Sequence, residues 1–144
     1  ARAIFRGPKV QRIGEDVTIV GAGFTTLVAE DAAAMLAEEG VRAEVIDLRV
    51  INPRDIAPVI ASGEKTRRVV VVDGGWTSCG LAGEVIAAVV ERLDPDVLRA
   101  APRRLTLQDV PAPTSGPLEQ QYYPTAERTV QLVREVLESA TRAV

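Results

Sequence analysis

The sequence of 144 residues contains no histidine, a single cysteine and only 3% aromatic residues. Histidine is the side chain most used for proton transfer near neutral pH and as a metal ligand. Its absence excludes a serine-protease triad, and any catalysis by this chain has to proceed without imidazole chemistry. The lone Cys79 excludes an internal disulfide and every paired-thiol motif, so we expect a reduced, cytoplasmic protein.

The sequence also lacks a hydrophobic run of the roughly 18 to 20 residues that a membrane span needs. Seventeen basic and 20 acidic residues give a net charge of -3, which provides neither a basic surface for nucleic acid nor an acidic tail. We therefore expect no nucleic acid and no membrane among its partners. Fifteen of the basic residues are arginines, which favours contacts with other proteins.

Short runs of β-branched residues alternate with longer helical patterns, which is typical of a parallel sheet flanked by helices. The predicted strands span residues 17–20, 43–48, 69–72 and 104–107. The predicted helices span residues 26–39, 81–93 and 124–142, with a short helix that begins at Asn52-Pro53 and ends at Ser62-Gly63. The helix over 81–93 is so apolar that we expect it to be largely buried.

The Gly21-Ala22-Gly23 turn follows a strand and begins a helix, and Asp47 ends the next strand. In a dinucleotide-binding module, such a turn approaches a pyrophosphate and such an acid binds a ribose hydroxyl. Against this interpretation, Thr26 stands where a third glycine or alanine is expected, and two glycines also suit an ordinary tight turn. An independent dinucleotide- or coenzyme-binding module therefore stays open as an alternative.

The segment between the third strand and the next helix reads Asp73-Gly74-Gly75-Trp76-Thr77-Ser78-Cys79-Gly80. It is not a nucleophile elbow, because Trp76 stands where the first glycine of Gly-x-Ser-x-Gly belongs and no histidine is present to serve as base. A packed or merely tolerated Cys79 is favoured over a reactive one. For Asp73, the role of a loop cap is favoured over that of a catalytic acid. We assign no catalytic residue, no cofactor-binding residue and no metal ligand to this chain.

Two features suit contact with a partner protein. Gly74, Gly75 and Trp76 end a buried parallel strand, where open α/β sheets bind their ligands, and tryptophan is a favoured interface residue. A proline-rich stretch, residues 110–117, excludes regular structure and is followed by Tyr122 and Tyr123. Each feature also has a competing interpretation. Trp76 caps the helix behind it, and the proline-rich loop wraps around the edge of its own sheet. The predicted contact residues are Gly74, Gly75, Trp76, Pro111, Pro113 and Pro117.

Four blocks of the sequence, taken in order, resemble the C-terminal domain of transketolase-type thiamine diphosphate enzymes. The blocks are residues 14–20, 44–55, 70–76 and 109–113. The nearest resemblance is to the beta subunit of the decarboxylating component of pyruvate and branched-chain 2-oxo acid dehydrogenases. The resemblance implies an α/β fold with three αβα layers and a five-stranded, mostly parallel sheet with one antiparallel strand, which the periodicity does not locate.

The resemblance also implies a division of labour in a longer parent protein. Thiamine diphosphate and magnesium lie between the alpha subunit and the N-terminal domain of the beta subunit, so we expect this fragment to bind neither and not to be catalytic. The parent oxidatively decarboxylates a 2-oxo acid and transfers the acyl group to lipoamide, as an oxidoreductase in a multienzyme complex. The C-terminal domain joins an alpha subunit and a second beta subunit in a heterotetramer and offers a docking surface for the dihydrolipoyl acyltransferase.

The chain begins Ala1-Arg2-Ala3-Ile4-Phe5-Arg6, which resembles the tail of the preceding domain. We therefore expect residues 1–13 to be this tail and a linker, and residues 14–144 to be the transketolase-type C-terminal domain. Leu81-Ala82-Gly83-Glu84 differs from the more usual Val-Gly-Ala-Glu at the start of that helix. The C-terminal domain of a transketolase or of a deoxyxylulose phosphate synthase therefore remains an alternative within the same superfamily.

Overall fold

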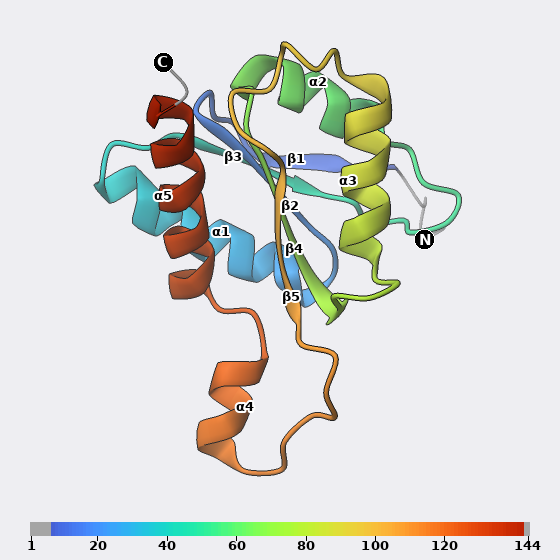
Figure 1. Ribbon diagram of the computed structural model, residues 1–144, viewed down its shortest axis with the longest axis vertical. Coiled ribbons are helices and arrows are strands. Elements are labelled where there is room, and N and C mark those ends of the chain that lie inside the picture. The colour runs from blue at the N-terminus through green and yellow to red at the C-terminus, as the bar shows by residue number, and fades with distance from the viewer. Residues whose placement is uncertain (1–6, 143–144) are drawn as a thin grey trace, which may run out of the picture.

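In the computed structural model, which describes residues 7–142, a five-stranded sheet has the strand order β1-β3-β2-β4-β5. Four of these strands run parallel to one another, and β1 pairs antiparallel with β3 at one edge (Figure 1). The strands are β1 (Lys9–Arg12), β2 (Val17–Gly21), β3 (Ala43–Asp47), β4 (Val69–Trp76) and β5 (Arg103–Leu107). The predicted mixed sheet is confirmed, and its antiparallel strand lies within the segment expected to be a linker.

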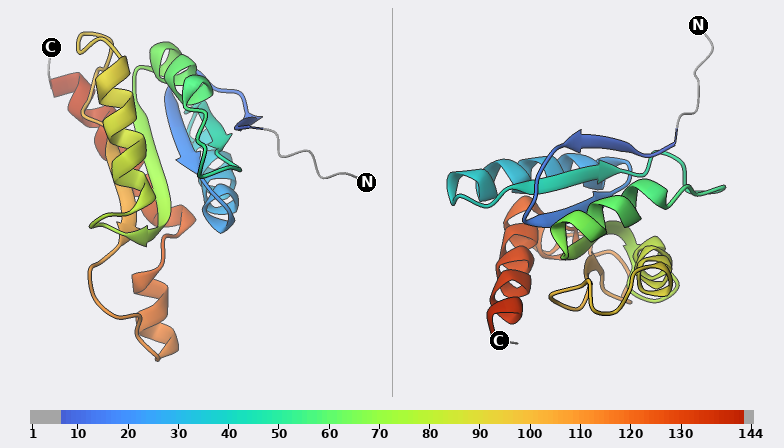
Figure 2. Two further views of the ribbon diagram at one scale, coloured as in Figure 1. Left: turned by 90° about the vertical axis from the view of Figure 1, so that its right-hand side faces the viewer. Right: turned by 90° about the horizontal axis from the view of Figure 1, so that it is seen from above.

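Helices cover both faces of this sheet and complete the predicted three layers (Figure 2). The helices are α1 (Phe24–Glu38), α2 (Ala57–Thr66), α3 (Leu81–Arg92), α4 (Gly116–Tyr122) and α5 (Ala126–Arg142). Of these, α1 and α5 pack on one face, and α2 and α3 pack on the other. Residues 1–6, which include the resemblance to a preceding domain, lie outside the described part of the chain.

Alternate residues of each strand feed two separate hydrophobic cores, as the twofold repeat of a strand requires. On β4, Val70 and Val72 join the core beneath α1 and α5, whereas Val69 and Val71 join the core beneath α2 and α3. All four are buried, which explains why this strand shows no polar alternation. The helix α3 is buried only along Ala82, Val85 and Val89, so the expectation that it is largely buried is wrong.

Three predicted boundaries differ from the structure by more than two residues. Helix α2 begins at Ala57, beyond the cis Asn52-Pro53 peptide, and it continues through Ser62 and Gly63 to Thr66. Ser62 remains helical because its hydroxyl lies 2.6 Å from that of the buried Thr18 of β2, so the α2 side chain is fixed by the sheet. The predicted loop from Asp73 instead extends β4 through Trp76.

Segment 108–125 leaves the carboxyl edge of the sheet and protrudes from the body, and we call it the arm (Figure 1). It contains α4, which the proline-rich composition did not predict. Pro117 is tolerated because it stands in the first turn of α4, where a backbone N–H has no partner within the helix. The arm then returns to the body, where α5 begins at Ala126.

Candidate functional site

The predicted contact residues of the first group lie where β4 leaves the body of the sheet. The carboxylate of Asp73 accepts a hydrogen bond from the Gly75 backbone N–H with one oxygen, and from the Ala82 N–H with the other, each at 2.9 Å. Because Ala82 lies in the first turn of α3, Asp73 ties the end of the strand to the start of the helix. This is the capping role predicted for Asp73.

Gly74 and Gly75 position this segment rather than offer side-chain contacts of their own. A β-carbon on Gly74 would lie 2.5 Å from the ring of Phe24, the first residue of α1, so a larger residue at position 74 would displace this ring. Both glycines are half-buried, whereas the Trp76 side chain is 56% exposed. Of the three residues, Trp76 is therefore the one available to a partner.

Trp76 is fixed by a two-step hydrogen-bond chain to the arm. Its indole N–H donates to the hydroxyl of Tyr122 at 3.0 Å, and this hydroxyl donates to the backbone carbonyl of Val110 at 2.8 Å. Tyr122 is buried, and its ring meets that of Tyr123 edge to face at a centroid distance of 5.1 Å. Tyr122 therefore joins the two ends of the arm to the end of β4.

The residues that follow Trp76 make a second connection to the base of the arm. Asp109 accepts hydrogen bonds from both the backbone N–H of Ser78 at 3.1 Å and its hydroxyl at 2.6 Å. These bonds from Ser78 hold the pKa of the Asp109 carboxyl below its ordinary value. The Thr77 hydroxyl donates to the Leu107 carbonyl at 2.9 Å. The hydroxyl of Ser78 is thus committed to positioning the arm, and sequence reasoning did not foresee this role of Asp109.

Two shallow hollows flank the arm where it joins the body. The first, of about 590 Å³, is lined by Trp76, Ser78, Asp109, Val110 and Pro111. The second lies against α4 and is lined by Gln108, Val110, Pro111, Pro113, Leu118, Gln121 and Tyr122. The structure thus brings Trp76, Pro111 and Pro113 together, while Pro117 lies exposed in the first turn of α4.

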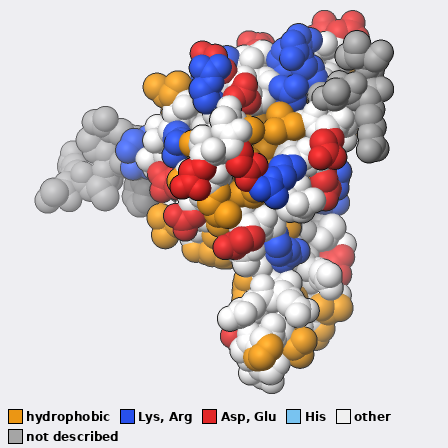
Figure 3. All heavy atoms as spheres, turned by 90° about the vertical axis from the view of Figure 1, so that its left-hand side faces the viewer, with side chains coloured by type: hydrophobic (Ala, Val, Ile, Leu, Met, Phe, Trp, Pro, Cys, Tyr) orange, Lys and Arg blue, Asp and Glu red, His pale blue; other side chains and the backbone are white. Residues whose placement is uncertain are grey.

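Exposed hydrophobic side chains gather at this end of the molecule. They are Phe24, Leu27, Trp76, Val110, Leu118 and Tyr123, each at least 40% exposed. Figure 3 shows hydrophobic surface along the arm and on the underside of the body from which it projects. An apolar surface of this kind on a protein of mixed charge is typical of an interaction site. We call these six residues together with Pro111 and Pro113 the arm surface.

Hydrogen bonds and close packing within the chain explain the residues of the candidate dinucleotide site. The Thr26 hydroxyl donates to one oxygen of Asp47 at 3.1 Å, and the Arg49 N–H donates to the same oxygen at 3.1 Å. A β-carbon on Gly21 would lie 2.8 Å from the Thr26 backbone nitrogen, so this glycine permits close packing of β2 on α1. The tight-turn interpretation explains all of these residues.

Cys79 is exposed and adopts a positive φ of 58° just before α3. Among the described residues, no group of three or more His, Cys, Asp or Glu side chains is arranged to hold a metal ion. No helix in residues 7–142 is long and apolar enough to cross a membrane. The described residues thus present no cluster of the carboxylate oxygens that magnesium prefers.

Residues 8–129 match the family described as "Transketolase, C-terminal domain". The chain belongs to this family. Its relatives include the beta subunit of acetoin:2,6-dichlorophenolindophenol oxidoreductase from Bacillus subtilis, 37% identical over 89% of this chain and 37% of the relative. The beta subunit of the pyruvate dehydrogenase E1 component from Ascaris suum is 38% identical over 92% of this chain and 37% of its own. The corresponding beta-1 subunit from Arabidopsis thaliana is 42% identical over 85% and 34%.

Among solved structures, a split-gene transketolase described as an inactive β4 tetramer superposes with a TM-score of 0.80. It shares 30% identity and is matched over 92% of this chain and 43% of its own. The chain therefore spans less than half the length of each of these relatives. Its match to pyruvate and acetoin enzyme subunits confirms the resemblance inferred from the four sequence blocks and disfavours the transketolase alternative.

Proposed function

We propose that this chain is the C-terminal assembly domain of the beta subunit of a thiamine diphosphate-dependent 2-oxo acid dehydrogenase. The parent protein decarboxylates a 2-oxo acid oxidatively and transfers the acyl group to lipoamide. The bound cofactor supplies the electron sink for loss of carbon dioxide. This chain supplies no reacting group and instead presents the arm surface to neighbouring subunits.

One observation carries the proposal. Between 35% and 42% identity to pyruvate dehydrogenase E1 beta subunits extends over most of the chain in relatives from animals, a plant, an amoeba and a bacterium. The arm surface supports an assembly role, because Trp76 and the proline segment together form an exposed apolar patch whose base is held by hydrogen bonds. Interface hot spots have this composition, with a large aromatic side chain in an apolar surround.

The finer parts of the proposal rest on the family resemblance of the sequence. We propose an alpha subunit and a second beta subunit as partners in a heterotetramer, and the dihydrolipoyl acyltransferase as the docking partner in a multienzyme complex. Residues 1–13 lead in from a preceding domain, and β1 within them completes the sheet of the domain at 14–144. The single cysteine supports a reducing compartment, and we propose the cytoplasm.

The activity is tested with the polypeptide that carries this chain, purified together with its alpha subunit, thiamine diphosphate and magnesium. We expect oxidation of a 2-oxo acid, measured with an artificial electron acceptor, only when both subunits are present. Acetoin is assayed in parallel, because a relative of similar identity is named for it. Ketose transfer without any oxidation of 2-oxo acids or acetoin would contradict the proposal and support the transketolase alternative.

The assembly role is tested by Trp76→Ala in the same protein. We expect the dissociation constant between subunits, measured by sedimentation velocity, to rise about tenfold or more, as at an interface hot spot. The matched control is Ile13→Ala, which truncates a side chain that is 82% exposed at the opposite end of the strands. Equal assembly of the Trp76→Ala protein and the control would count against the arm surface as the interface.

A further inference from the structure

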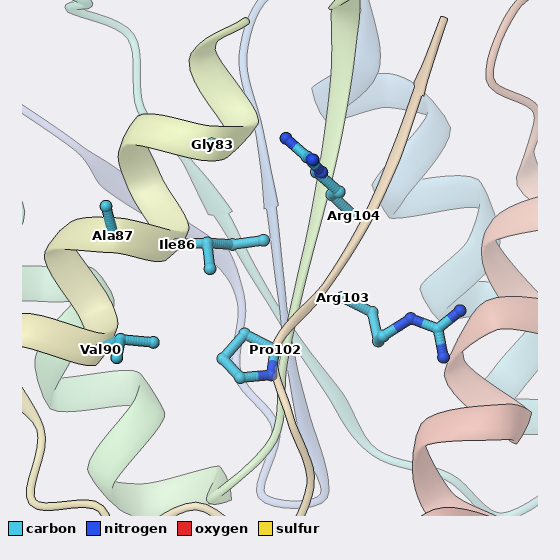
Figure 4. A pocket seen from close by; sticks show the side chains of 7 residues that line it. All are labelled: Gly83, Ile86, Ala87, Val90, Pro102, Arg103 and Arg104. Atoms are coloured by element: carbon cyan, nitrogen blue, oxygen red, sulfur yellow. The ribbon is translucent and has the colours of Figure 1, made fainter. Parts of the chain in front are cut away.

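The free edge of β5 borders a hollow that the proposed function does not use. Within the described residues, β5 pairs only with β4, so its other edge offers unpaired backbone groups. Beside this edge lies the outward face of α3. Between them is a hollow of about 520 Å³ lined by Gly83, Ile86, Ala87, Val90, Pro102, Arg103 and Arg104 (Figure 4).

Most residues that line the hollow are apolar, and a second hollow adjoins it before the start of β5. Val90 is 54% exposed, and Ile86 projects from α3 towards β5. A second hollow shares Val90 and Pro102 with the first and is otherwise lined by Pro95, Leu98, Arg99, Ala100, Ala101 and Ser139. Together the two hollows form one groove beside the free edge of β5, which we call the β5 groove.

The charges that line the β5 groove are all positive. Arg99, Arg103 and Arg104 are its only charged lining residues, although the chain as a whole has a net charge of -3. Arg103 points towards α5, where its guanidinium lies 3.6 Å from the carboxylate of Glu135. Arg104 points to the other side of the strand, and its guanidinium donates to the Thr77 carbonyl at 2.9 Å.

The guanidinium of Arg104 lies close to a glycine of α3. A β-carbon on Gly83 of α3 would lie 3.3 Å from one guanidinium nitrogen of Arg104, tighter than an ordinary contact. Gly83 thus leaves room for the guanidinium at the end of the groove. Because only one of its N–H groups donates to another described residue, Arg104 retains donors for a carboxylate.

We propose that the free edge of β5 binds an extended acidic segment of another protein as an added strand. The backbone of this segment pairs with β5, and alternate side chains point to opposite faces. Side chains on the α3 face enter the apolar groove, while carboxylates of the segment meet Arg104 on that face and Arg103 on the other. The backbone bonds supply affinity, and the groove and arginines supply specificity for apolar and acidic residues.

The arginines argue against a second copy of this chain as the occupant. Pairing two β5 edges about a twofold axis would bring Arg103 and Arg104 of both copies into one interface. Like charges that face each other across paired strands are destabilising, and charged side chains are a common protection of an edge against self-association. An acidic segment instead places carboxylates opposite these arginines, so the repulsion becomes an attraction.

The test uses the 144-residue chain and two blocked eight-residue peptides, one in which pairs of valines alternate with pairs of glutamates and one in which they alternate with pairs of lysines, so that each face of the added strand presents both residue types. We expect the glutamate peptide to bind with a micromolar dissociation constant and to slow amide hydrogen exchange in β5. Raising the salt from 50 to 500 mM should weaken this binding at least fivefold, since screening reduces contacts between exposed charges. The lysine peptide should bind at least tenfold more weakly. Equal binding of the two peptides, or protection confined to the arm, would overturn the proposal.

Three variants locate the binding site. Arg104→Glu should weaken binding of the glutamate peptide at least tenfold, and Arg104→Gln should have an intermediate effect. The control is Lys9→Glu, which makes the same charge change on the exposed edge strand β1 and should leave binding within twofold. Thermal melts of each variant check the fold.

Equal losses of peptide affinity for Arg104→Glu and Lys9→Glu would contradict the proposal. Dimers that form through β5 without peptide would also contradict it. Subunit assembly by Trp76 is measured separately, so failure here leaves the proposed function standing.

Discussion

Glu44 shows how one residue of β3 keeps a charge inside the domain. Its side chain is buried, and it accepts hydrogen bonds from the Gly14 N–H at 3.2 Å and from the ammonium group of Lys65 on α2. Burial raises the pKa of the Glu44 carboxyl, but the bonds from Lys65, Gly14 and Ser62 together outweigh burial and lower it below the ordinary value. The carboxylate therefore ties the start of β2 and the end of α2 to β3.

We expect Glu44→Gln to lower the free energy of unfolding by about 1–3 kcal/mol at pH 7, because a charged hydrogen-bond acceptor is lost from a buried site. The lowered pKa means that the carboxylate stabilises the fold above the unfolded-state pKa, roughly 4.3, and that this contribution is lost as the pH falls through the folded-state pKa. The difference between wild type and variant, measured by urea unfolding, should therefore shrink below about pH 4.5.

The control for Glu44→Gln is Glu15→Gln, which makes the same chemical change but removes an exposed ion pair with Arg42. Exposed pairs contribute about 1 kcal/mol or less, so this variant should unfold close to wild type at pH 7. A Glu44→Gln protein as stable as the Glu15→Gln protein would show that the buried carboxylate does not hold the two elements together.

At the scale of elements, the sequence predicts the elements that depend on local pattern and misses those that depend on distant contacts. The local sequence alone predicts β4 from its run of valines and α5 from its helical pattern. Strand β1 was not, because its four residues carry two charges and acquire their structure by pairing with β3, about 35 residues away in sequence. Likewise α2 continues through Ser62 and Gly63 because the sheet packs against them.

The candidate site likewise combines residues that the sequence predicts with contacts that it does not predict. Trp76, Pro111 and Pro113 were predicted from their residue types and do line adjoining hollows. The hydrogen bonds that assemble the site, from Trp76 to Tyr122 and from Ser78 to Asp109, span 46 and 31 residues of sequence. No local pattern records such a separation, so their geometry required the fold.

The arm as an element depends on the hydroxyl of Tyr122. We expect Tyr122→Phe to remove both the bond from Trp76 and the bond to the Val110 carbonyl, which costs about 0.5–1.5 kcal/mol for each. Trp76 is the only tryptophan, so its fluorescence reports the change directly as a red shift and as easier quenching by acrylamide. Amide exchange in the arm should also accelerate.

Tyr123→Phe provides the matched comparison, because it removes a hydroxyl from the neighbouring tyrosine, whose side chain is 40% exposed. The tryptophan fluorescence of the Tyr123→Phe protein and the amide exchange rates in its arm should stay close to those of wild type. If both variants loosened the arm equally, the hydrogen-bond chain through Tyr122 would not be its anchor.

For the whole molecule, stability and assembly reside in different parts. The two hydrophobic cores draw on the sheet and on α1, α2, α3 and α5, whereas α4 contributes to neither of them. The only buried residue of α4 is Tyr122, which serves the junction with Trp76. The body should therefore fold without the arm, and the apolar surface of the arm is retained for a purpose other than folding.

Replacing residues 111–121 by a Gly-Ser linker of the same length tests this separation. We expect far-ultraviolet circular dichroism and fluorescence to report one coincident unfolding transition, as for a cooperative domain, because both cores remain complete. The melting temperature should fall by only a few degrees, while subunit association in the parent protein should weaken at least as much as in Trp76→Ala.

A chain that ends at residue 125 is the contrasting variant, because it removes Val130, Val133 and Val136 from one core and should lose cooperative unfolding. Loss of cooperativity in the linker variant, or its normal assembly, would show that the arm serves the fold rather than the interface.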